Sequence, residues 1–101
     1  MVNLVYRYLF DADVALEEVE AAMVLALFGA ESLYGASRTR LETAQHLDRE
    51  KRVLVLDAST PVGSVLAKLF TGFLMRELGP DDFRVERLAT PPVNSFPFER
   101  N

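Results

Sequence analysis

VLVLDASTPVGSVLAKLFTGFLMRELG, residues 53–79, carries the clearest structural signal in this chain. It begins with four β-branched and leucine residues, the pattern of a strand buried on both faces. Thr60 is a good N-cap, and Pro61 suits the first helical position because its φ is already helical. Apolar residues then recur every three or four positions until Gly79, which tolerates a left-handed C-cap, and Pro80, which cannot continue a helix. The stretch predicts a buried strand, a tight connection and a capped helix.

A glycine close to a helix start also raises the possibility of a phosphate site, since helix N-termini offer free amides. Gly63, however, falls inside the expected helix, and Pro61 removes one amide donor. Neither GxxxxGK[ST] nor GxGxxG is present in the chain. We therefore interpret the segment as an ordinary capped helix.

The composition of the 101-residue chain predicts one domain, residues 1–89, followed by a proline-rich tail, residues 90–101. Half of the residues are hydrophobic, which is high for a domain this small and favours a partner surface. The net charge is −4 and the basic residues are scattered, which argues against a nucleic-acid groove. The absence of cysteine excludes disulfides, thiolate metal sites and cysteine nucleophiles.

No membrane or secretion segment is expected. The longest uncharged helical run, residues 21–30, is far shorter than the roughly 20 apolar residues that span a bilayer. The N-terminus has the pattern of a strand rather than a basic region followed by an apolar run. We therefore expect a cytoplasmic protein that uses no cofactor.

The first half of the chain predicts a strand and a long helix. Residues 3–10 are aromatic and β-branched, and Asp13 is placed to cap the helix that runs to about Leu33 and stops at Gly35. One helical stripe suits the core: Leu16, Val19, Met23, Ala26, Leu27, Ala30 and Tyr34. A second stripe falls on the opposite side of the helix: Ala21, Val24, Leu25 and Phe28. A helix that is apolar on both sides must be covered on both sides.

The second half predicts two more strands around the central stretch. Residues 37–48 alternate polar and apolar as a half-exposed strand does, and Arg49 and Glu50 form a two-residue hairpin tip. Phe83–Leu88 forms the last strand. The order strand, helix, strand, strand, helix, strand predicts a ferredoxin-like plait, in which a four-stranded antiparallel sheet of order 4-1-3-2 carries both helices on one face.

Two families with this element order do not match the chain. The RNA-recognition module carries aromatic and basic residues on its third strand, where this chain has VLVLD. The amino-acid-binding regulatory module has glycine in its first strand–helix connection, where this chain has DADVA.

The open face of the sheet collects the charged residues. Strand parity places on it Arg7, Arg38, Arg40, Glu42, His46, Asp57, Arg84 and Glu86. The expected hairpin register sets Glu42 opposite Asp57, with Arg7 within reach of either carboxylate. Arg7, Arg40, Glu42 and Asp57 are therefore the candidate ligand-binding residues, and the two carboxylates are a possible acid–base pair. We favour plain cross-strand pairing, because no nucleophile or metal-ligand spacing accompanies them.

His46 is the only histidine, and no cysteine or second histidine is available to complete a zinc site. It is interpreted as a solvated strand residue, and no metal is expected.

Apolar residues beyond one core point to association. Three groups are available to a partner: the helical Val24, Leu25 and Phe28, the open-face Val5, Leu9, Val53 and Val55, and the tail residues Val93, Phe96 and Phe98. We expect a homodimer or higher oligomer. The competing possibility is that the tail folds back and covers the helix of its own chain.

Three functions remain open, in this order. The first is a non-enzymatic assembly or interaction domain that self-associates through its apolar surfaces. The second is a small-ligand-binding or sensory domain with a polar site between subunits. The third is a small enzyme of the dimeric plait type, with the same polar residues in acid–base roles. A deep pocket at those residues would favour the second or third, and a flat dry interface the first.

Overall fold

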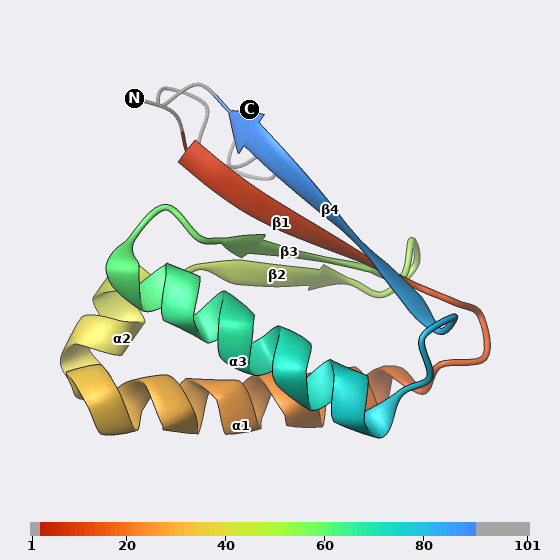
Figure 1. Ribbon diagram of the computed structural model, residues 1–101, viewed down its shortest axis with the longest axis horizontal. Helices are drawn as coiled ribbons and strands as arrows, with labels where there is room; N and C mark the ends of the chain where they lie inside the picture. The colour runs from red at the N-terminus through yellow and green to blue at the C-terminus, as the bar shows by residue number, and fades with distance from the viewer. Residues whose placement is uncertain (1–2, 91–101) are drawn as a thin grey trace.

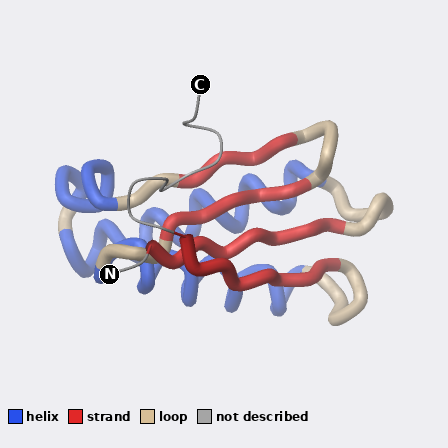
Figure 2. Tube along the Cα trace, turned by 90° about the horizontal axis from the view of Figure 1, so that it is seen from above, coloured by secondary structure: helices blue, strands red, loops and turns tan. Residues whose placement is uncertain are grey.

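Four antiparallel strands form one open sheet in the computed structural model, which describes residues 3–90 (Figure 1). The sheet order is β2-β3-β1-β4, which is the predicted order read from the other edge. Three helices lie on one side of the sheet, seen behind the strands in Figure 2. The elements in chain order are β1 (Asn3–Phe10), α1 (Leu16–Tyr34), α2 (Ala36–Glu42), β2 (Gln45–Asp48), β3 (Val53–Asp57), α3 (Pro61–Glu77) and β4 (Phe83–Thr90). The predicted tail lies outside the described residues, except for Thr90, which ends β4.

The central strand–helix unit forms as its residues predict, except at its C-terminal end. The Thr60 hydroxyl accepts a 2.9 Å hydrogen bond from the Gly63 amide, and the helix begins at Pro61. The helix ends at Glu77, and the backbone of the C-cap residue Leu78 is extended. A left-handed cap at Gly79 was the wrong prediction, because the Gly79 amide instead donates a 2.7 Å hydrogen bond to the Asp82 carboxylate. A side chain from the following turn thus replaces the glycine cap.

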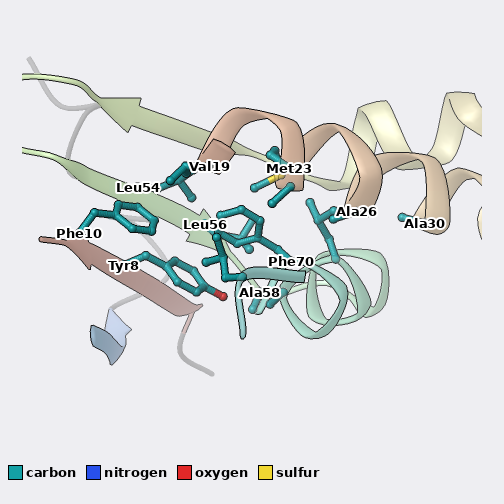
Figure 3. Packing of buried hydrophobic residues seen from close by; sticks show 14 of the residues in the cluster. Tyr8, Phe10, Val19, Met23, Ala26, Ala30, Leu54, Leu56, Ala58 and Phe70 are labelled. Atoms are coloured by element: carbon teal, nitrogen blue, oxygen red, sulfur yellow. The ribbon is translucent and has the colours of Figure 1, made fainter. Parts of the chain in front are cut away.

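The core fills the space between the sheet and the two long helices. Tyr8 of β1 and Phe70 of α3 meet edge to face, with ring centroids 4.9 Å apart (Figure 3). Leu54 and Leu56 of β3 are fully buried beside them. The core is therefore one cluster that joins β1 and β3 to α1 and α3. Val53 and Val55 on the open face are only partly buried, so the prediction of a strand buried on both faces was wrong: the helices cover only one face of the sheet.

Helix α1 presents the predicted core stripe to this cluster. Its buried residues include Leu16, Val19, Met23, Ala26 and Ala30, and Leu27 and Tyr34 are partly buried against them. Gly35 ends the helix as predicted, at a φ of 88° that favours glycine. The predicted Asp13 cap was wrong: the N-cap position is Ala15, which provides no side-chain hydrogen bond.

The segment predicted as a strand over residues 37–48 is mostly helical. Helix α2 occupies Ala36–Glu42, and only Gln45–Asp48 pair with β3. Arg38 bonds Glu42 one helical turn ahead and lies 5.0 Å from the Tyr34 ring centroid, so local contacts favour the helix. The alternation that suggested a strand depended on threonines, and its one large apolar residue in this part, Leu41, is 84% exposed.

The hairpin register differs from the prediction by two residues. A four-residue connection, residues 49–52, replaces the two-residue tip, and Arg52 adopts a left-handed φ of 59°. The Asp48 carboxylate accepts a hydrogen bond from the Lys51 amide within this turn. The Asp57 amide therefore bonds the Ala44 carbonyl, so residue 44 rather than residue 42 lies beside Asp57.

Helix α2 contains a buried hydroxyl that predicts a stabilising substitution. Thr39 is 1% exposed, and its Oγ1 has no hydrogen-bond partner within the described part of the chain. Thr39→Val keeps the shape and removes the unpaired polar atom, so the free energy of unfolding should rise by about 1 kcal/mol in urea denaturation. Thr43→Val is the matched control, because the Thr43 hydroxyl donates a 2.6 Å hydrogen bond to the Thr39 carbonyl. It should not stabilise the protein, and a loss of stability in Thr39→Val would contradict the explanation.

Candidate functional site

Arg7, the first of the predicted polar residues, forms a cross-strand pair on the open sheet face. It lies on β1 opposite Glu86 of β4, and its Nε and Nη2 contact Glu86 Oε1 at 2.9 and 2.5 Å. Both side chains remain partly exposed, 44% and 38%. The sequence placed Glu86 on this face but did not identify it as the partner of Arg7, because strand parity gives the face and not the neighbour.

The other three predicted ligand residues do not join Arg7. Helix α2 carries Arg40 and Glu42 away from the strand positions expected for them, and the Glu42 carboxylate pairs with Arg38 at 2.9 Å. The Asp57 carboxylate accepts a 2.9 Å hydrogen bond from the Ser59 amide. Within residues 3–90, no hydrogen bond or ion pair joins any two of Arg7, Arg40, Glu42 and Asp57. The carboxylate pair expected from the hairpin register does not form.

A polar hollow of about 250 Å³ lies at the turn end of the sheet. Arg52 lines it and donates hydrogen bonds to the backbone carbonyls of Asp11, at 3.1 and 2.9 Å, and Val14. Its guanidinium therefore connects the β2–β3 turn to the β1–α1 loop. The hollow is lined by Leu9, Phe10, Asp11, Lys51, Arg52, Asp81, Asp82, Phe83 and Arg84. Because Arg52 already bonds the loop carbonyls and the lining mixes acidic and basic side chains, the hollow is best explained as a structural connection between the loops.

Residues 3–90 contain no group of three or more histidines, aspartates and glutamates placed to hold a metal ion. No single helix in that range is long and apolar enough to cross a membrane. Helices α1 and α2 reach that length and apolar character only together, and they are bent by 118° where they meet.

The second stripe of α1 is exposed. Val24, Leu25 and Phe28 are 48%, 51% and 61% accessible, and Phe28 is a neighbour of the other two on the helix surface because it lies four residues from Val24 and three from Leu25. We call these three residues the α1 patch. The sequence predicted that something covers this stripe, and no part of residues 3–90 does so.

The predicted apolar group on the open sheet face is less available. Leu9, Val53 and Val55 are partly buried, and Val5 is only 1% exposed although it lies outside the core cluster. Val5 therefore offers almost no contact area to another molecule. Leu9 pairs with Val53 and Arg7 with Val55 across the β1–β3 ladder, so the apolar positions are interrupted by charge.

An apolar groove that the sequence did not reveal runs between α3 and β4. Its volume is about 440 Å³, and its lining residues are Thr71, Met75, Leu78, Gly79, Pro80, Phe83 and Val85. Met75 is 68% exposed and Val85 is 41% exposed. We call it the α3–β4 groove. Its walls belong to two different elements, a helix and the strand that follows it, so periodicity within either element could not predict it.

Comparison with known proteins finds no family model that the chain matches, no curated protein similar to it in sequence, and no solved structure that matches it.

Proposed function

We propose that this protein is a non-enzymatic interaction domain that self-associates, and that two copies meet through the α1 patch. The exposure of Val24, Leu25 and Phe28 on one helix face is the observation that carries the proposal. Clustered large apolar side chains are unfavourable in water, and their burial against a second copy contributes roughly 25 cal/mol per Å². A two-fold contact of one face with itself is the commonest arrangement of homodimers.

The chemistry of the patch suits a helix-to-helix contact. The α1 run from residue 21 to residue 30 has no charged side chain, so its centre can be dehydrated without burying an ion. Ala21 lies one turn before Val24 and Leu25, and its small side chain allows close approach. The acidic residues of α1 lie nearer its ends, and Glu20 is already paired with Arg49 at 2.5 Å.

We also propose that the fold is a ferredoxin-like plait with one additional short helix, and that the protein acts in the cytoplasm. The strand order and the placement of α1 and α3 on the same face support this assignment. Helix α2 follows α1 directly after Gly35 and extends the first crossover.

Phe28→Glu tests the α1 contact. We expect light scattering at micromolar concentration to show an assembly for the unmodified protein, and at most half of that mass for the variant, because a buried glutamate must lose its hydration. Leu41→Glu is the matched control, because Leu41 is 84% exposed on α2, outside the α1 patch. The assembly formed by this variant should have the same mass as that of the unmodified protein. An unmodified chain that is strictly monomeric would end the proposal of self-association. An unchanged mass in Phe28→Glu would exclude the α1 patch.

A further inference from the structure

Strand β4 is a long edge of the sheet. It pairs with β1 over eight consecutive positions without a bulge, and no strand within the described residues pairs with its other side. Alternate amides and carbonyls of β4 therefore point away from the sheet, which makes the edge a template for another strand. The opposite edge, β2, is only four residues long. Figure 2 shows the two outer strands at opposite edges of the sheet.

The α3–β4 groove runs beside this edge on the helix side. Met75 and Val85 leave apolar surface exposed there, where α3 does not reach across β4. Unpaired backbone and uncovered apolar side chains thus lie next to each other. A partner that adds a strand to β4 would form hydrogen bonds with the unpaired backbone and cover part of the exposed apolar side chains.

We propose that β4 pairs antiparallel with β4 of a second copy of this chain, with the two-fold axis at Val85. The two four-stranded sheets then form one continuous eight-stranded sheet. The order of charges along the strand is the reason for choosing a second copy as the partner. This contact uses no residue of the α1 patch and does not depend on the proposed function.

The charges of β4 select the register. On the open face, an axis at Val85 places Arg84 opposite the partner's Glu86, and symmetry forms this pair twice. Axes at Arg84, Glu86 or Arg87 place two like charges directly opposite each other. An axis at Leu88 pairs no opposite charges.

Glu86 can accept this second arginine. Both contacts from Arg7 use Glu86 Oε1, and no hydrogen bond or ion pair within residues 3–90 uses Oε2. The partner's Arg84 would therefore complete a row Arg–Glu–Arg across the joined sheets. Charge-assisted hydrogen bonds of this kind select the register more than they add affinity.

The helix side of β4 also fits this register. Val85 meets the partner's Val85 at the axis, and Phe83 lies opposite the partner's Arg87. The stem of an arginine can cover an aromatic ring while its guanidinium stays in water. The two α3–β4 grooves then adjoin across the axis.

A protomer with two different two-fold contacts assembles beyond a dimer, as a closed tetramer or a longer chain. The β4 contact is therefore tested in the Phe28→Glu background, where the α1 contact is removed. That protein should remain a dimer in light scattering and sedimentation.

Two charge reversals probe the register within this background. Arg84→Glu sets like charges opposite each other in its own dimer, and so does Glu86→Lys, so each should dimerise about tenfold more weakly or worse. An equimolar mixture of the two should recover the dimer, because positions 84 and 86 of the two chains then carry opposite charges. Lys68→Glu, an exposed site on α3, is the control for net charge and should stay dimeric.

Thermal melting of each variant shows whether it is folded, since Glu86→Lys also removes the partner of Arg7. Recovery of the dimer only in the mixture would support the β4 pairing. A monomeric Phe28→Glu protein, a dimer unaffected by either reversal, or a mixture that stays monomeric would each overturn it.

Discussion

Gly63→Ala is expected to lower the free energy of unfolding by roughly 2–3 kcal/mol. A Cβ atom at Gly63 would lie 2.4 Å from the Asp57 carbonyl oxygen and 3.0 Å from Thr60 Oγ1. The first neighbour is backbone at the end of β3, and the second is the hydroxyl that caps α3. Neither can move without disturbing the connection between strand and helix.

The same helix provides a control with the opposite sign. Gly72 is exposed on α3, and a Cβ there would meet no atom within 4 Å outside the helix itself. Gly72→Ala should therefore stabilise the protein by about 0.5–1 kcal/mol, because alanine is the better helix former. Urea denaturation of both variants measures the contrast. Equal effects of Gly63→Ala and Gly72→Ala on the free energy of unfolding would show that the short distances around Gly63 do not exclude a larger residue there.

Above pH 10 the protein should lose roughly 2–3 kcal/mol of stability through Tyr8 alone. Burial is the largest influence on this phenol and raises its pKa, the 2.7 Å hydrogen bond with Thr71 lowers it, and nearby Tyr6 raises it slightly. The pKa of Tyr8 in the folded protein is about 12, against 10.0 for the free side chain. The tyrosinate is thus disfavoured by folding.

The direction of the pH dependence follows from this shift. The pKa of Tyr8 is raised in the folded state. The contribution of the Tyr8 phenol to the free energy of unfolding is therefore fully present below pH 10 and is lost as pH rises through about 12. Urea denaturation at pH 9, 10, 11 and 12 should show the decline. Tyr8→Phe should be about 1 kcal/mol less stable at neutral pH, since Thr71 loses its partner, yet decline less between pH 10 and 12. An equally steep decline in Tyr8→Phe would assign the effect to other groups.

Both predictions depend on parts of the fold that local sequence rules describe well. Thr60 and Pro61 mark the start of α3, and the spacing of apolar residues predicts the buried faces of α1, β3 and α3. These features depend on residues close in sequence, such as a cap and its amide or two side chains one turn apart. The sheet order also followed, because short crossovers leave few ways to connect four strands.

The polar site could not be predicted in the same way. Residues 36–42 alternate like a strand, yet the local contacts of Arg38 with Tyr34 and Glu42 favour a helix. The burial of Thr39 adds packing that the alternation does not reveal. The register of β2 depends on a four-residue turn held by Asp48 and Arg52. A shift of two residues keeps each side chain on its face but changes every neighbour.

The residue pattern alone accounts for β1, β3 and β4, the long helices, the core stripes and the surplus of apolar side chains, because each depends on contacts within about one turn or one strand. It did not separate α2 from β2. Packing in three dimensions settled which of those side chains stay exposed, the pairing of Arg7 with Glu86, and the groove beside β4. The Arg7–Glu86 pair joins strands near opposite ends of the described chain, and the groove combines side chains of a helix and a strand. Their energies depend on burial and geometry that no single segment contains.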